Sequence, residues 1–95
     1  HIPMTMIVAP GILTITREEE VRNAALHSGF AEVLPDRVTI LAEIIEWPEE
    51  IDLSRAEESK GRAEERIKEH APGTDMDRAE LSLRRAVARI EVVKG

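Results

Sequence analysis

The amino-acid sequence predicts an α+β fold, in which an antiparallel sheet of the sandwich or barrel kind is followed by an antiparallel hairpin of two helices. Apolar residues recur at every second position up to Ile44, and at every third or fourth position from Asp52 onwards. The net charge of −6 lies entirely in residues 1–51, whereas residues 52–95 carry ten charges of each sign. We therefore expect two domains, residues 1–47 and residues 48–95, which meet at Trp47–Pro48.

Five short strands are expected in the first half of the chain. They cover Ile2–Val8, Leu13–Ile15, Val21–Leu26, Phe30–Leu34 and Val38–Ile44. The turns between them are predicted at Pro10–Gly11, Glu18–Glu20, Ser28–Gly29 and Pro35–Asp36. Turns at such close spacing are typical of an antiparallel sheet. No other segment of the first half is available as a second layer over the sheet's apolar face.

The second half has the apolar spacing of two helices. The first is expected to begin at Asp52, a good N-cap, and to end at His70. Thr74 and Asp77 resemble a capping box that opens the second helix. The apolar residues of this helix recur at steps of four and three and form a narrow seam: Ala79, Leu83, Ala86, Ile90 and Val93. Because alanine buries little apolar surface, the hairpin is expected to be weakly stable and able to move.

Composition excludes several classes of function. The 95 residues contain no cysteine, which excludes a disulfide framework, a thiolate zinc site and a cysteine nucleophile. The acidic net charge disfavours nucleic acid and anionic membranes as partners, because clustered basic residues bind both. The longest apolar run, Met6–Leu13, is too short to span a bilayer. Since no spacing fits a catalytic triad, a glycine-rich phosphate loop or a metal site, no catalytic or metal-binding residue is predicted.

Arg85 and Arg89 are the most unusual charged residues of the sequence. They lie one helical turn apart, and neither has an acidic residue three or four positions away, as most helix arginines do. In one interpretation they form a solvated basic end that complements the helix dipole. In the other they bind an anion or an acidic partner, because guanidinium groups pair well with phosphate and carboxylate.

Arg55 and Arg62 lie seven residues apart on one face of the first predicted helix. In the simpler interpretation, Asp52 is only the helix cap and Arg55 its partner within the first turn. In the functional interpretation, Arg55 and Arg62 face the second helix, where Arg85 and Arg89 complete a group of four cations around one pocket. A nucleoside triphosphate would neutralise these cations and hold the hairpin closed.

Several segments together resemble the epsilon subunit of bacterial F-type ATP synthase. The strongest similarity is the run SGFAEVLPDRVTILA at residues 28–42. His1–Met4 resembles the segment after a Pro-Gly turn in the family's sandwich, and Arg78–Arg89 is similar to its last helix. Ile51–Ala56 fits the family's nucleotide motif, Ile/Leu-Asp-x-x-Arg-Ala. These similarities follow one another in order and together span the whole chain.

The resemblance implies a β-sandwich, incomplete in this chain because the family's N-terminal strands are absent, followed by a two-helix hairpin. It implies a non-catalytic rotor subunit that couples the gamma subunit to the c-ring. The subunit would be peripheral, at the cytoplasmic face of the bacterial plasma membrane, without inserting into it. The hairpin would be a switch that permits turnover when folded. Extended along gamma, it would inhibit ATP hydrolysis and contact the beta (and alpha) subunits through Arg84, Arg85 and Arg89.

The nucleotide motif implies a binding site for ATP. The positions that contact ATP in the family match Glu46, Asp52, Arg55, Ala56, Arg62, Arg85 and Arg89. ATP would be a regulatory ligand that favours the folded hairpin by binding it alone, and no cofactor is required.

Three rival functions stay open at this point. A purely structural coupling subunit would inhibit hydrolysis without binding nucleotide, so it would have no ATP affinity to lose in an Arg85→Ala variant. A small independent hydrolase would require steady ATP turnover by the isolated chain. A free-standing interaction domain would require residues 1–95 to fold alone, which we do not expect because the predicted sheet has no cover.

Overall fold

The computed structural model describes residues 4–95, and the side chains of residues 9–95. The strands are β1 (Met4–Val8), β2 (Gly11–Arg17), β3 (Glu20–Leu34) and β4 (Arg37–Glu46). A 3₁₀ turn, η1 (Pro48–Glu50), leads to the helices α1 (Leu53–Glu69) and α2 (Met76–Lys94). The expected order of an antiparallel sheet and a helical hairpin is confirmed, while the predicted strand start at Ile2 lies outside the described residues.

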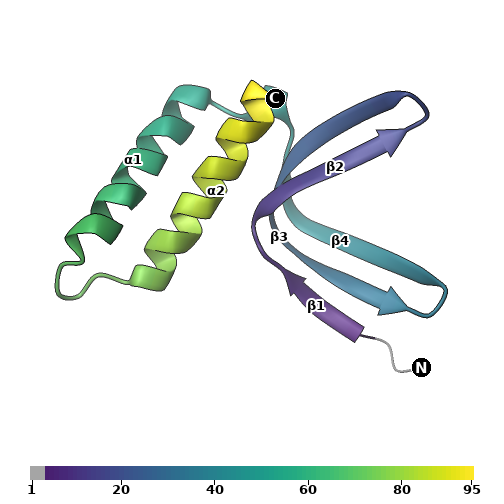
Figure 1. Cartoon of the computed structure of the whole chain (residues 1–95), viewed down its shortest axis with the longest axis horizontal. Coiled ribbons are helices and arrows are strands. Elements are labelled where there is room, and N and C mark those ends of the chain that lie inside the picture. Colours follow the sequence, from purple (N-terminus) through teal and green to yellow (C-terminus); the bar gives the residue numbers. More distant parts are fainter. Residues whose placement is uncertain (1–3) are drawn as a thin grey trace.

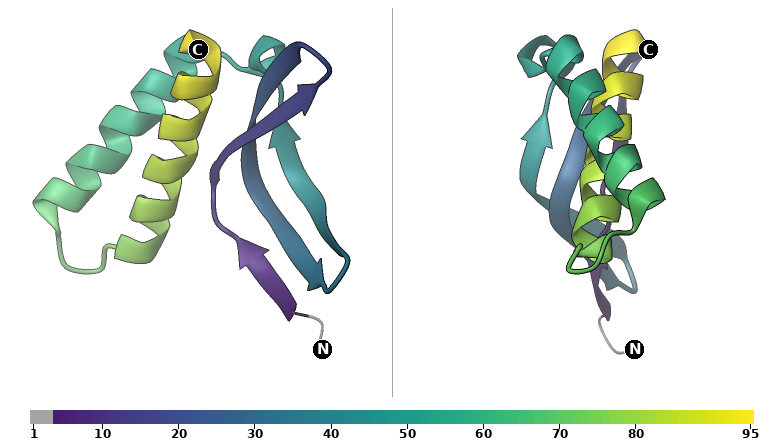
Figure 2. Two further views of the ribbon diagram at one scale, coloured as in Figure 1. Left: turned by 45° about the vertical axis from the view of Figure 1, so that its right-hand side comes forward. Right: turned by 90° about the vertical axis from the view of Figure 1, so that its left-hand side faces the viewer.

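The helical hairpin packs on the sheet through α2. Figure 1 shows α2 between α1 and the strands, and the rotated view in Figure 2 keeps this order. The contacts agree, because α2 packs on β2, β3 and η1 while α1 packs on α2. Neither helix has the length and apolar composition needed to cross a lipid bilayer.

The long strand β3 organises the sheet. β1 and β2 follow one another along one edge of β3, and β4 pairs along the other edge, all in antiparallel register. The chain passes from β1 to β2 at Pro10, as the sequence predicts. It reverses direction in two-residue turns at Glu18–Glu19 and Pro35–Asp36, close to the predicted positions.

The expected turn at Ser28–Gly29, and with it the expectation of five strands, is wrong. β3 continues through both residues, and its pairing with β4 shifts register there, which marks a β-bulge. Glycine is needed at position 29 because no room exists for a side chain. A Cβ atom there would lie 2.6 Å from the backbone oxygen of Leu41. This glycine therefore marks a close approach of two backbones inside a strand pair.

Aspartate side chains begin both helices. The carboxylate of Asp52 accepts a hydrogen bond of 3.1 Å from a backbone N–H in the first turn of α1, as predicted. α1 ends at Glu69, and His70 follows as a C-cap with a left-handed backbone. The capping box predicted from Thr74 is wrong by one residue, because Asp75 caps α2 with a hydrogen bond of 3.0 Å. Aspartate and threonine both cap helices well, so spacing alone did not separate them.

The packing of the hairpin relies on alanine. Its buried residues are Ala56 and Ala63 on α1, and Ala79, Ala86, Ala88 and Val92 on α2. Ala88 and Val92 pack with Ala25 of β3, so α2 uses a second face to join the sheet. An ion pair of 3.6 Å between Glu57 and Lys94 adds a link between the helices. Since methyl groups bury little area, the hairpin is held by many small contacts.

The sheet is a single layer with large apolar side chains in solvent. Within the described side chains these are between 39% and 63% exposed: Ile12, Ile15, Val21, Phe30, Val38, Ile40, Leu41 and Ile44. A sheet normally buries its apolar face against a second layer. The expectation that residues 1–95 do not fold alone is consistent with this exposure and stays a prediction.

Replacing Gly29 with alanine should destabilise the protein by about 1–3 kcal/mol, because the added methyl group meets a backbone oxygen of the paired strand. Urea denaturation measures the change. Gly61→Ala is the matched control: an added Cβ meets nothing within 4 Å at this helix position, and the change should stabilise by up to about 1 kcal/mol. Equal stability of the Gly29→Ala variant and the unmodified protein would contradict the close approach of the two backbones.

Candidate nucleotide site

Two adjoining cavities lie at the helical hairpin. The first is where the hairpin meets the end of the sheet, and the second is between α1 and α2. The first has a volume of about 320 Å³ and the second about 220 Å³. Ser59 of α1 and Arg89 of α2 line both cavities, so the two spaces are neighbours. Their combined size is in the range of small-molecule binding sites.

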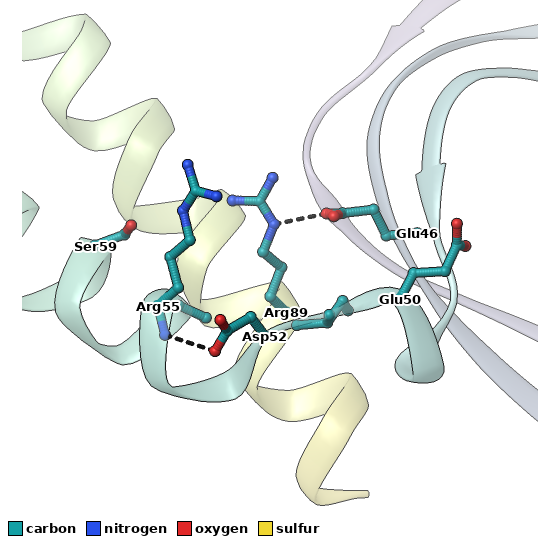
Figure 3. A pocket seen from close by; sticks show the side chains of 8 residues that line it. Glu46, Glu50, Asp52, Arg55, Ser59 and Arg89 are labelled. Carbon is teal, nitrogen blue, oxygen red and sulfur yellow. Dashed lines mark hydrogen bonds and ion pairs between the residues drawn. The ribbon is translucent and has the colours of Figure 1, made fainter.

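The first cavity has an acidic and a basic side. Glu46 reaches it from the last position of β4, and Asp52 from the N-cap of α1. Arg55 and Ala56 come from the first turn of α1, and Arg89 comes from α2. Figure 3 shows the guanidinium groups of Arg55 and Arg89 side by side, with Glu46 beyond them. The end of β4, the start of α1 and the body of α2 thus bring together residues that are far apart in the sequence.

Glu46 is the centre of the polar contacts at this junction. Its Oε1 accepts a hydrogen bond of 2.6 Å from Nε of Arg89 and lies 2.5 Å from Nε2 of His27 on β3. Partial burial by itself would raise the pKa of Glu46, but the hydrogen bonds from Arg89 and His27 outweigh it and hold the pKa below its ordinary value. Glu46 is therefore ionised at neutral pH, and it neutralises Arg89.

The second cavity is lined by arginine without a carboxylate. Arg62 and Arg66 reach it from α1, and Arg85 and Arg89 from α2. Arg62 donates a hydrogen bond of 3.1 Å to the hydroxyl of Ser59. The Nε atom of Arg85 is buried, and among the described residues it has no hydrogen-bond partner. A buried unpaired donor is costly, so this cavity favours an anion that supplies acceptors.

Trp47 directly follows Glu46, which lines the first cavity. The guanidinium of Arg22 lies 4.3 Å from the centre of its ring, and Arg22 also pairs with Glu49 at 3.0 Å. The ring is half-buried, so its surroundings depend on how the junction between sheet and helices is arranged. Trp47 is the one tryptophan of the sequence and is therefore a specific fluorescent reporter.

All seven residues predicted to contact ATP line one of the two cavities: Glu46, Asp52, Arg55, Ala56 and Arg89 the first, and Arg62, Arg85 and Arg89 the second. The four arginines thus surround two adjoining spaces and not the single pocket that helical spacing suggested. Whether ATP binds there stays a prediction.

Arg84, predicted with Arg85 and Arg89 to contact the beta subunit, lies elsewhere. It borders a separate groove between α2 and β2, with Leu83 and Pro10 among its neighbours. The three arginines therefore occupy two sides of α2 in this arrangement.

Sequence reasoning missed several polar residues of the two cavities: Glu50, Ser59, Arg66 and Ser82. A signal was available for two of them, because Ser59 lies four residues after Arg55, and Arg66 lies four residues after Arg62, on the same face of one helix. The contact of His27 with Glu46 had no such signal, since it joins two strands 19 residues apart.

Two models of one protein family match the chain. The model described as the beta-sandwich domain of the ATP synthase delta/epsilon chain matches residues 1–48, and the model of its long alpha-helix domain matches residues 49–94. An ATP synthase epsilon chain from Shouchella clausii is 45% identical over 95 residues, covering 99% of this chain and 69% of the relative. The epsilon chain of Bacillus velezensis is 44% identical over 92 residues, covering 97% of this chain and 70% of the relative. That of Moorella thermoacetica is also 44% identical, covering 96% and 69%.

Proposed function

Because the chain belongs to the delta/epsilon family of ATP synthase subunits, as an epsilon subunit of the bacterial F-type enzyme, we propose that its helical hairpin binds ATP and regulates the complex. The subunit is non-catalytic in this proposal. It couples the gamma subunit to the c-ring as part of the rotor, on the cytoplasmic face of the membrane. Its hairpin inhibits ATP hydrolysis when it extends toward the beta and alpha subunits.

The observation that carries the proposal is the arginine-lined second cavity beside the mixed first one. The phosphates of ATP would lie in the second cavity, where Arg62, Arg85 and Arg89 offer guanidinium donors. The nucleoside would lie in the first, where the carboxylates of Glu46 and Asp52 can accept hydrogen bonds from its amino or hydroxyl groups. Charge thus orients the ligand, with its phosphates in the second cavity and its nucleoside in the first.

Such a ligand would control the position of the hairpin. Two of the four arginines come from α1 (Arg55 and Arg62) and two from α2 (Arg85 and Arg89). Their like charges repel when the helices close, and an anion between them removes that repulsion. Because ATP would bind the closed arrangement alone, it would shift the hairpin toward the closed state in proportion to its concentration.

One observation favours the alternative function, a structural coupling subunit that does not bind nucleotide. The ion pair between Arg89 and Glu46 already neutralises one of the four cations within the protein. In this alternative the remaining arginines serve only the contact with the catalytic subunits in the extended state. The two functions differ in one measurable property, which is affinity for ATP.

Titration of the full-length subunit with ATP, followed by the fluorescence of Trp47, separates the two functions. We expect a saturable change, because Trp47 adjoins Glu46 at the cavity edge. Calorimetry under the same conditions covers the case in which the tryptophan does not respond. Absence of binding by both methods at millimolar ATP would overturn the proposal and leave the coupling function.

A further inference from the structure

His27 is a buried ionisable residue at the junction between sheet and hairpin. Its side chain is only 1% exposed, and among the described side chains it is the single polar one in the buried core. Histidine in such a place is normally held by hydrogen bonds to both ring nitrogens. Here Nε2 contacts the carboxylate of Glu46 at 2.5 Å, whereas Nδ1 is buried and has no partner among the described residues.

The contacts define the protonation state of the ring. An ionised carboxylate only accepts hydrogen bonds, so Nε2 of His27 must carry the proton that it donates to Glu46. A second proton would sit on Nδ1, where no acceptor is in reach. The closed arrangement therefore fits a neutral imidazole and has no place for the imidazolium.

The charges around His27 act in both directions. Glu46 of β4 attracts a proton to the ring, while Arg89 and Arg85 of α2 repel it. Burial has the largest influence and lowers the pKa of His27, the hydrogen bond to Glu46 opposes it, and the two arginines lower it further. The net result is a pKa below the ordinary value of 6.5.

One carboxylate oxygen connects His27 to the candidate ATP site. Oε1 of Glu46 accepts hydrogen bonds from Nε2 of His27 and from Nε of Arg89. Both Glu46 and Arg89 line the first cavity. His27 lines neither cavity. The hydrogen bond from His27 thus orients the carboxylate of Glu46 toward Arg89 of α2.

We infer that His27 is a positioning residue for the nucleotide site and makes closure of the hairpin sensitive to acid. Neutral His27 holds Glu46, and through Glu46 it holds Arg89 and α2 against the sheet. Protonation of His27 adds a further positive charge to this buried junction, where Glu46 already pairs with Arg89 and Arg85 is also near, so α2 separates from the sheet. Weaker binding of ATP follows, a consequence that rests on the function proposed above.

The sign of the pH dependence follows from the two states of the hairpin. When α2 is released, His27 meets water and titrates near its ordinary pKa, whereas in the closed state its pKa is lower. The released state therefore takes up the proton more readily. Closure is fully favoured above about pH 6.5, and it weakens by about tenfold for each pH unit below that value until the closed state is itself protonated.

Nuclear magnetic resonance of the full-length subunit without nucleotide is the first test. The imidazole signal of His27 should titrate below the ordinary histidine value of 6.5. The amide signals of Arg85 and Arg89 should shift with the same midpoint as the ring of His27. Titration of His27 at or above pH 6.5, or α2 signals that do not follow it, would overturn the inference.

ATP affinity at pH 7.5 and pH 5.5 is the second test, with His27→Gln and His70→Gln as variants. The phosphates of ATP also titrate in this range, so the comparison is between proteins and not between pH values alone. Between pH 7.5 and pH 5.5, the ATP affinity of the unmodified subunit and of the His70→Gln variant should fall about tenfold more than the affinity of the His27→Gln variant falls. An equal loss in all three proteins would overturn the role of His27. If none binds ATP at either pH, the proposed function fails, and the ring and amide titrations still decide whether His27 controls closure.

Discussion

Arg85→Ala is expected to weaken ATP binding to the full-length subunit by about 100-fold, because truncating a buried group that pairs with a charged ligand costs roughly 2–5 kcal/mol. The Nε atom of Arg85 is buried without a hydrogen-bond partner among the described residues, and Arg85 lines the second cavity, where its guanidinium group can donate to a phosphate. Calorimetric titration with ATP measures the loss. Because Arg85 is only half-buried and makes no ion pair within the described residues, its removal should leave the thermal stability nearly unchanged.

Arg84→Ala is the matched control for this experiment. Arg84 is the neighbouring arginine on the same helix, but it borders the groove between α2 and β2 and neither cavity of the candidate site. Its removal changes the net charge by the same amount and should leave the ATP affinity within about twofold, since exposed charges at this distance are screened. An Arg84→Ala variant that loses as much affinity as Arg85→Ala would show a general effect of charge and contradict the assigned site.

The same pair of variants separates the two roles that the arginines of α2 were predicted to have. Arg85 is expected to serve ATP in the closed hairpin and the beta subunit in the extended one, whereas Arg84 serves only the second. Inhibition of ATP hydrolysis in the assembled complex should therefore weaken in both variants. ATP affinity should weaken in Arg85→Ala alone.

Structural features that depend on interactions between residues close together in the sequence could be predicted. The cap at Asp52, the turn at Pro35–Asp36 and the extent of α1 depend on residues within a few positions. The errors arose where two local signals were equally good. Thr74 and Asp75 are both acceptable caps, and the glycine of Ser28–Gly29 is compatible with either a turn or a β-bulge. In the second case the carbonyl of Leu41 decided the outcome, and it lies on another strand.

The candidate site was predictable only in part, because its charge balance is made across the fold. Arg89 has no acidic neighbour in its own helix, yet it is neutralised by Glu46, 43 residues away. The sequence pattern singled out Arg85 and Arg89 as a pair but could not show that, among the described residues, Arg89 pairs with a carboxylate and Arg85 does not. Glu46, Asp52 and Ala56 were indicated by the family motif alone. His27 was beyond reach, because its role depends on the pairing of two strands.

Ala86→Leu should open the hairpin. Ala86 is fully buried on α2, and the buried residues of α1 are the alanines Ala56 and Ala63. Leucine is a good helix former, so both helices should persist, but its added carbons have no space between closely packed helices. Such overpacking costs about 1–3 kcal/mol, which corresponds to about 5- to 150-fold in the equilibrium between closed and open hairpin. The apparent Kd for ATP should rise by the same factor once the open form predominates, and inhibition of hydrolysis in the assembled complex should increase.

Glu80→Leu tests whether the position, and not the added leucine, is responsible. Glu80 is exposed on the same helix, so a leucine there meets solvent and should leave closure unchanged. Circular dichroism should give the same helix content for both variants, while amide hydrogen exchange in α1 should become faster in Ala86→Leu only, because α1 contacts the rest of the protein chiefly through α2. Slow exchange and unchanged ATP affinity in Ala86→Leu would mean that the alanine contact does not limit closure. In that case the polar junction of His27, Glu46 and Arg89 would be what holds the hairpin.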